Sequence, residues 1–147
     1  MNAYMEMKHR HQEEINAFPV VFAFGNQQFE EAMKKLGLKP SETDKVCSIY
    51  GAGDIFRKSD VPAYLEIVKR HHKEMEDAIA ADRTGEGFIY DMFDYELSNH
   101  EYGYTRDPSD ALDALGISWN RLENDERLLR GFKKACKYQA DWYDEHN

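Results

Sequence analysis

The segment from Phe88 to Tyr102 has the period of an amphipathic helix, and it constrains the fold more than any other part of the chain. Projected at 100° per residue, it has one apolar side and one polar side. The apolar side carries Ile89, Met92, Phe93 and Leu97, and the polar side carries Asp91, Asp94, Ser98 and Glu101. A helix with this pattern needs other elements against its apolar side, so the chain must build a core around it.

Two polar residues, Glu96 and His100, fall in the middle of that apolar side, one turn apart. A buried carboxylate or imidazole costs free energy unless it pairs, binds a ligand or lines a cleft. The sequence therefore predicts a buried polar pair of Glu96 and His100. The pair is structural if its members form a charge-assisted contact, hydrogen-bond a nearby backbone group or lie at the edge of a groove. It is functional if Glu96 tunes His100 as a base or a ligand.

The remaining sequence predicts a mostly helical α+β fold, with about six or seven helices packed on a small antiparallel sheet of about three strands. Helices are expected over residues 3–17, 27–36, 60–80, 88–102 and 108–115, with two more toward the C-terminus. Strands are expected at 20–24, 46–50 and 55–57, and residues 102–105 are a candidate fourth strand. A length of 147 residues fits one domain spanning 1–147.

Several expected helices carry end signals. Gly37 before Leu38 and Gly116 before Ile117 have the pattern of Schellman stops, in which the glycine ends the helix and the next residue packs back. The expected N-caps are Asn26, Ser59, Asp107, Ser118 and Asn124. The last helix is expected to pack one side from Leu128 to Trp142.

The net charge of −9 is concentrated in residues 84–126, which carry 2 basic and 11 acidic side chains. An acidic surface repels phosphate backbones, so it argues against direct nucleic-acid binding and favours a protein partner with a basic surface. Tyrosines beside carboxylates are typical of a contact face, unless neighbouring helices cover them. The predicted contact residues are Tyr90, Asp91, Asp94, Tyr95, Glu101 and Tyr102.

A metal site is the alternative. His11 and His72 lie on the apolar stripes of their helices and would meet Glu96 and His100 if these helices pack together. Three imidazoles and a carboxylate suit Zn²⁺ or Fe²⁺, in a metal-binding protein or a small metal-dependent enzyme. No metal-ligand motif requires this, so the leading interpretation has no cofactor. A structural homo-oligomer, with the tyrosine face as self-contact, is a third hypothesis.

The compartment follows from what the chain does not contain. It has no run of about 18 apolar residues, so a membrane span is not expected. Its N-terminal segment is polar, so a signal peptide is not expected either. Cys47 and Cys136 stand in no motif and are interpreted as free thiols. A cytoplasmic location is expected.

Several segments carry a resemblance. They are FAFGNQQFEEAMKKLGL, GAGDIFRKSD, HHKEMEDAIAAD, FIYDMFDYELSNHEYGYT and DALDALGI. Over nearly its whole length the chain resembles a family of short acidic proteins of unknown function from gut anaerobic bacteria and their phages and mobile elements. The resemblance carries over no catalytic residue, and it implies an accessory gene of mobile DNA. The leading hypothesis is a non-enzymatic protein whose acidic region docks on a basic protein surface. An inhibitor of a host defence or nucleic-acid-handling protein is one form of it.

Overall fold

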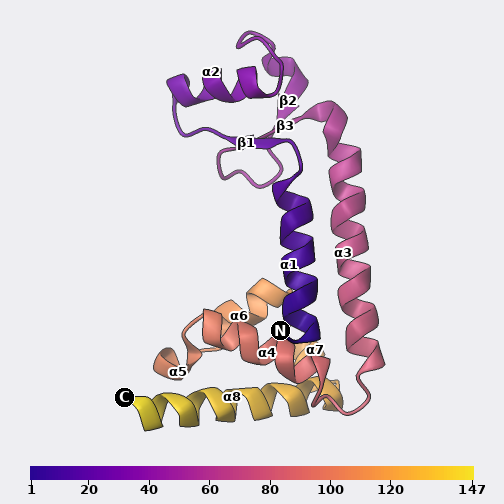
Figure 1. Ribbon diagram of the computed structural model, residues 1–147, viewed down its shortest axis with the longest axis vertical. Helices are drawn as coiled ribbons and strands as arrows, with labels where there is room; N and C mark the ends of the chain where they lie inside the picture. Colours follow the sequence, from indigo (N-terminus) through magenta and orange to yellow (C-terminus); the bar gives the residue numbers. More distant parts are fainter. The chain divides into compact units, whose positions relative to one another are not determined.

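The computed structural model describes residues 1–147 and confirms an α+β fold, with eight α-helices and one three-stranded antiparallel sheet (Figure 1). The elements are α1 (Ala3–Asn16), β1 (Val20–Phe22), α2 (Asn26–Lys35), η1 (Thr43–Lys45), β2 (Val46–Cys47), β3 (Asp54–Arg57), η2 (Lys58–Asp60), α3 (Val61–Ala81), α4 (Phe88–Asn99), α5 (Tyr102–Thr105), α6 (Ser109–Leu115), α7 (Trp119–Glu123) and α8 (Glu126–His146). The helix that the sequence did not predict is α5, and it replaces the candidate strand at 102–105. None of the helices combines the length and the apolar character that a membrane crossing requires.

The chain divides into two compact units, whose boundaries fall inside α1 and α3. Unit 1 consists of Met1–Arg10 and Glu74–Asn147, and unit 2 consists of His11–Lys73.

Unit 1 is built around α4, which lies beside α8 and α6 (Figure 1). The predicted apolar side of α4 is fully buried in a core to which α8 contributes Leu128, Phe132 and Ala135. The two helices approach closely at Gly131 of α8. A Cβ atom there would lie 2.3 Å from the Gly85 carbonyl oxygen and 2.7 Å from Ile89 Cγ2. Glycine is therefore required where α8 crosses the start of α4.

Both predicted glycine stops are present. The Leu38 amide donates to the Met33 carbonyl at 2.9 Å, and the Ile117 amide donates to the Leu112 carbonyl at 3.0 Å. These are the bonds that define a Schellman motif, so they end α2 and α6 as expected.

The N-terminal caps follow the sequence only in part. Asn26 is the first residue of α2, and Gly25 occupies the cap position. Ser118 caps α7, because its hydroxyl accepts from the Arg121 amide at 3.1 Å. Asp125, rather than Asn124, caps α8. Ser59 lies in η2, and α3 begins two residues later. Asp107 accepts from the Ser109 amide at 2.9 Å, so its carboxylate stabilises the start of α6 from outside the helix.

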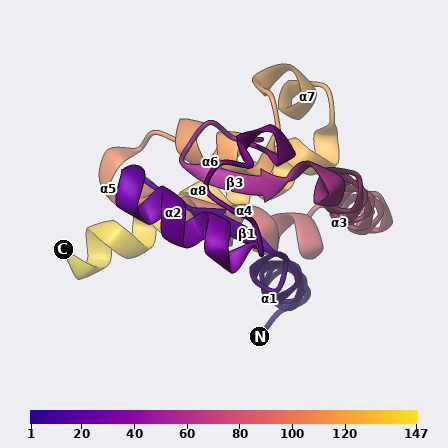
Figure 2. The same cartoon turned by 90° about the horizontal axis from the view of Figure 1, so that it is seen from above.

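Unit 2 contains the sheet, in which β3 pairs with β1 on one side and β2 on the other, both antiparallel. Val21 lies opposite Ile55, and α2 packs against β1 (Figure 2). The predicted β2–β3 hairpin is confirmed, with Cys47 opposite Phe56. Because β1 is an edge strand, its outer side has no partner strand.

The loop of the hairpin is held by Asp54, one of the two buried charged residues of the chain. Its carboxylate accepts from the Ser48 hydroxyl at 2.8 Å, and from the amides of Ile49, Tyr50 and Ala52 at 2.8, 2.9 and 3.0 Å. Burial alone would raise the pKa of Asp54, but these hydrogen bonds lower it below its ordinary value. The glycine-rich loop is therefore organised around its own carboxylate.

Candidate functional site

Glu96 lies in the interior of unit 1, with 1% of its surface exposed. Its Oε2 atom accepts hydrogen bonds from the Tyr4 hydroxyl and from Lys8 Nζ, the latter at 2.7 Å. Tyr4 and Lys8 are one turn apart on α1, so they reach the same carboxylate. An ammonium and a hydroxyl together offset much of the free energy that burying a carboxylate costs.

His100 ends α4, where its Nδ1 atom lies 2.8 Å from the main-chain carbonyl oxygen of Glu96. A carbonyl only accepts, so this contact assigns the proton to Nδ1. The same Nδ1 is 3.9 Å from Glu96 Oε1, an atom without a hydrogen-bond partner. The imidazole and the carboxylate are neighbours, but His100 is only partly buried, and the short contacts of the carboxylate come from Tyr4 and Lys8.

The surroundings of Tyr4 enclose this cluster. Burial raises the pKa of the Tyr4 hydroxyl, and its hydrogen bond to Glu96 raises that pKa further, so the hydroxyl stays protonated and keeps donating. Its ring packs against Phe88 and Tyr95 of α4. The cluster attaches the first turns of α1 to α4 and leaves no open access to the carboxylate.

Of the six predicted contact residues, Glu101 is exposed and the other five are partly buried. Much of this cover comes from α8. Lys134 places its Nζ atom 5.1 Å from the centre of the Tyr90 ring, and Gln139 Nε2 donates to Asp94 at 2.8 Å. Part of the predicted acidic tyrosine face is therefore an internal surface of unit 1.

The other partly buried contact residues have inward partners too. Tyr95 packs on Tyr4 of α1, and Tyr102 is hydrogen-bonded to the Cys136 thiol. Burial, then the nearby Asp94 carboxylate, raises the pKa of Asp91. Helices that are distant in sequence cover this side of α4, so a helical projection of α4 alone places these residues on the surface.

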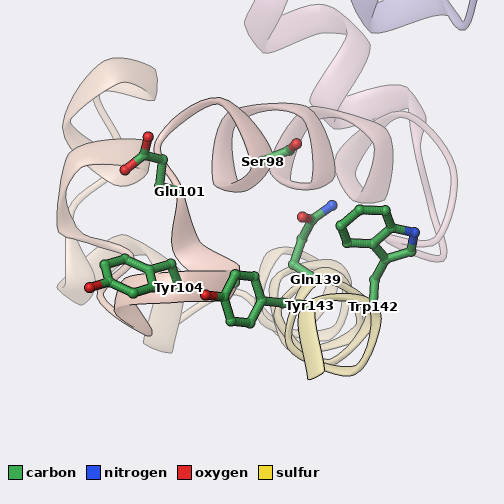
Figure 3. A pocket seen from close by; sticks show the side chains of 7 residues that line it. Ser98, Glu101, Tyr104, Gln139, Trp142 and Tyr143 are labelled. Atoms are coloured by element: carbon green, nitrogen blue, oxygen red, sulfur yellow. The ribbon is translucent and has the colours of Figure 1, made fainter. Parts of the chain in front are cut away.

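An open pocket of about 410 Å³ lies where the end of α4 and the short α5 meet the last turns of α8 (Figure 3). Figure 3 shows Glu101 and Tyr104 at one end and Trp142 at the other. The lining residues are Ser98, Glu101, Gly103, Tyr104, Gln139, Trp142 and Tyr143. Of these, the sequence singled out only Glu101 as a contact residue.

The backbone around α5 creates this pocket. Glu101 and Arg106 flank α5 with φ of 57° and 60°, in the left-handed region that costs a non-glycine residue about 1 kcal/mol. Between them Gly103 touches α8, where an added Cβ would lie 2.9 Å from Tyr143 Cβ and 3.1 Å from the Gln139 carbonyl oxygen. The tight turn therefore seats α5 directly on α8 and directs Glu101 to the pocket.

Some charged groups near the pocket have partners and one does not. Arg106 donates to the Gly103 carbonyl at 2.9 Å and forms an ion pair of 2.5 Å with Asp144 of α8. Glu101 has no ion pair, and no lysine or arginine lines the pocket. Tyr104 is 72% exposed and Trp142 is 48% exposed. The lining of the pocket thus includes an unpaired carboxylate and exposed aromatic rings.

Trp142 departs from its expected position on the packed side of the last helix. The buried residues of α8 end at Ala135, and Cys136 is the last residue that packs against the core from this helix. The feature that could have revealed this is the difference in helix length: α8 has 21 residues, whereas α4, against which it packs, has 12. The last turns of α8 therefore have no stretch of α4 to cover them.

The four residues of the metal alternative do not form a ligand set. The structure places no group of three or more histidine, cysteine, aspartate and glutamate side chains to hold a metal ion. The His11 ring stacks on His71 at 3.8 Å, and His71 Nε2 lies 2.6 Å from a Glu14 oxygen. His72, expected on the packed side of α3, is exposed. His71 therefore occupies the helix side that the sequence assigned to His72.

The fold and the pocket define a mostly helical α+β protein with an open pocket whose lining includes a carboxylate and aromatic rings. The chain belongs to a family of unknown function, DUF7659, whose model matches residues 3–138. No curated protein and no solved structure matches the chain.

Proposed function

We propose that this protein is a non-enzymatic interaction protein that binds a basic surface of another protein through the pocket between α4, α5 and α8. The observation that carries the proposal is a pocket lined by both the unpaired Glu101 carboxylate and the exposed rings of Tyr104 and Trp142. Exposed aromatic side chains in a concave site supply anchored contact, and the carboxylate selects a positive charge.

The charge distribution supports this choice of partner. The net charge is −9, and residues 84–126, which include Glu101, carry the acidic excess. Such a field repels nucleic acid and speeds the encounter with a basic protein. Glu96, the most buried carboxylate of unit 1, is held by Tyr4 and Lys8 and is closed to solvent. A substrate therefore cannot reach it, which favours binding over catalysis as the function.

One specific form of the proposal is an inhibitor, encoded by a phage or mobile element, of a host defence protein that handles nucleic acid. An acidic face that docks on a basic nucleic-acid-binding surface would exclude the nucleic acid from it. In that case, single- or double-stranded DNA added to the captured complex releases the partner in proportion to its concentration. A complex that DNA leaves intact contradicts this form.

The test of the function itself is capture of the partner by charge-reversed variants. Glu101→Lys with Glu145→Lys changes two exposed carboxylates, one in the pocket and one on the last turns of α8. Glu30→Lys with Glu66→Lys makes the same change of net charge in unit 2, also at exposed positions. The first pair is expected to abolish capture of a basic partner at low salt, and the second to preserve it.

Salt provides the internal check on this capture. The Debye screening length falls to about 8 Å at physiological ionic strength, so capture by the unmodified chain is expected to weaken as salt rises. Equal capture by both double variants contradicts the proposal.

Self-association is a second candidate, favoured by the edge of the sheet in unit 2. The outer side of β1 is unpaired, and Phe22 and Phe24 are 57% and 76% exposed beside it. A second copy of this chain offers the same apolar edge. Light scattering at two concentrations is expected to detect a dimer that Phe24→Lys removes. A monomer at both concentrations contradicts this candidate.

A further inference from the structure

We propose that the pocket between α4, α5 and α8 receives the side chain of an arginine from the partner protein. This inference rests on the proposed function, because it names the chemical group that the basic partner contributes. Three properties of the pocket select that group: its charge, its aromatic rings and its hydrogen-bond acceptors.

The charge of the pocket selects a cation. Glu101 lines the pocket and is not paired, whereas two nearby carboxylates, one on α4 and one on α8, already have partners. Asp144 is paired with Arg106, and Asp94 accepts from Gln139. A cation that enters the pocket therefore meets a single free carboxylate and no competing lysine or arginine in the lining.

The aromatic rings select a flat cation. The Tyr104 and Tyr143 rings lie 6.0 Å apart and are tilted by 56°, and both line the pocket with Trp142. His146 stacks on Trp142 at 4.1 Å, so one face of the indole is covered. A guanidinium stacks on aromatic faces and is more weakly hydrated than an ammonium, so it loses less when it leaves water for such a site.

The acceptors also fit a guanidinium. Glu101 provides two carboxylate oxygens, and the Ser98 hydroxyl lies in the same lining. A guanidinium presents five N–H donors in a planar fork, whereas an ammonium concentrates three donors on one atom. The volume of about 410 Å³ admits a whole arginine side chain together with the ends of its neighbours.

The test uses three blocked tripeptides, with arginine, lysine or citrulline between two glycines. Citrulline has nearly the shape of arginine but no charge. The chain has two tryptophans, so Trp119→Phe leaves Trp142 in the pocket as the fluorescent reporter. The arginine peptide is expected to change Trp142 fluorescence saturably and to bind at least about fivefold more tightly than the lysine peptide. The citrulline peptide is expected to give no saturable change.

Matched variants separate the pocket from general electrostatics. Glu101→Gln and Tyr104→Ala are each expected to weaken binding of the arginine peptide by about five- to tenfold. Glu123→Gln removes an exposed carboxylate outside the lining, and Tyr138→Ala removes an exposed tyrosine of α8 outside it. Both controls are expected to bind as the parent does.

Three results would each overturn the assignment to arginine: no saturable response, equal affinity for the lysine peptide, or undiminished binding by Glu101→Gln. These outcomes are separate from the failure of the proposed function. If the arginine peptide fails while charge reversal at Glu101 still abolishes capture of a basic protein, the function stands and the arginine assignment falls. If the arginine peptide binds but charge reversal leaves capture unchanged, the pocket binds arginine, but the proposed function falls and with it the assignment of that arginine to a partner protein.

Discussion

Lys8 Nζ lies 2.7 Å from Glu96 Oε2, although the two residues are 88 positions apart in the sequence. The Lys8 side chain is 41% exposed and the Glu96 side chain is 1% exposed, so a cation at the surface neutralises an anion in the core of unit 1. This pair and the Tyr4 hydrogen bond explain why an acidic residue is stable in the middle of the apolar side of α4.

Lys8→Met is predicted to lower the free energy of unfolding by about 2–3 kcal/mol, because it leaves the Glu96 carboxylate buried without its cation. Urea denaturation measures the loss. Lys69→Met, at an exposed lysine of α3, is the control and is expected to have little effect. In the Lys8→Met background, Glu96→Gln is expected to lower the free energy of unfolding by less than it does in the parent. The carboxylate that it removes is then already without its cation. Unchanged stability of Lys8→Met contradicts this role for the pair.

Gly131→Ala is predicted to destabilise the chain by about 1–3 kcal/mol, although alanine is the better helix former. The added methyl would lie 2.3 Å from the Gly85 carbonyl oxygen, so α8 must move away from α4. Gly25→Ala is the matched control, because a Cβ there has no neighbour within 4 Å. Thermal unfolding of both variants compares them. Equal melting temperatures would show that the helices do not approach as closely as described.

The lowered pKa of Asp54 predicts that the folded chain loses stability in acid. Its pKa is lower in the folded chain than the ordinary value of 3.8, so its contribution is complete above that value. The contribution declines as the pH falls below 3.8 toward the folded pKa. Urea denaturation at pH 5 and pH 3 is expected to show a smaller decrease for Asp54→Asn than for the parent. An equal decrease in both would mean that other groups govern the acid sensitivity.

Cys136 is predicted to react slowly with alkylating reagents. Burial raises the pKa of its thiol to about 11, so little thiolate is present at neutral pH. The rate of iodoacetamide labelling in a Cys47→Ser variant is expected to rise about tenfold per pH unit up to pH 9. Mass spectrometry follows the modification. Rapid labelling of Cys136 at pH 7 contradicts the burial of the thiol against Tyr102.

The elements of the fold were predictable where local patterns determine them. The apolar period of residues 88–102 located α4, and the glycine stops at Gly37 and Gly116 located the ends of two helices. The hairpin of β2 and β3 followed from two β-prone runs around a glycine-rich turn. The segment at 102–105 was misassigned, because two left-handed residues that are not glycine, Glu101 and Arg106, create a helical turn in a β-prone stretch.

The candidate site was less predictable, because long-range packing creates it. Glu96 was located on the apolar side from its own helix, but its partners Tyr4 and Lys8 come from the first helix of the chain. The cover of Tyr90 by Lys134 likewise depends on where α8 lies. Trp142 lines the pocket because α8 extends beyond the last of its buried residues. Helical periodicity does not show where a helix leaves the core.

The proposed role of the pocket is tested most directly by photo-crosslinking from inside it. A benzophenone amino acid replaces Tyr104 in the pocket, or the exposed Tyr50 in unit 2 as a control position. We predict that a protein with a basic surface is crosslinked from position 104, that Glu101→Lys removes this crosslink, and that position 50 gives none. A crosslink of equal yield from both positions, or one that Glu101→Lys leaves unchanged, would contradict the proposal that this pocket binds the partner.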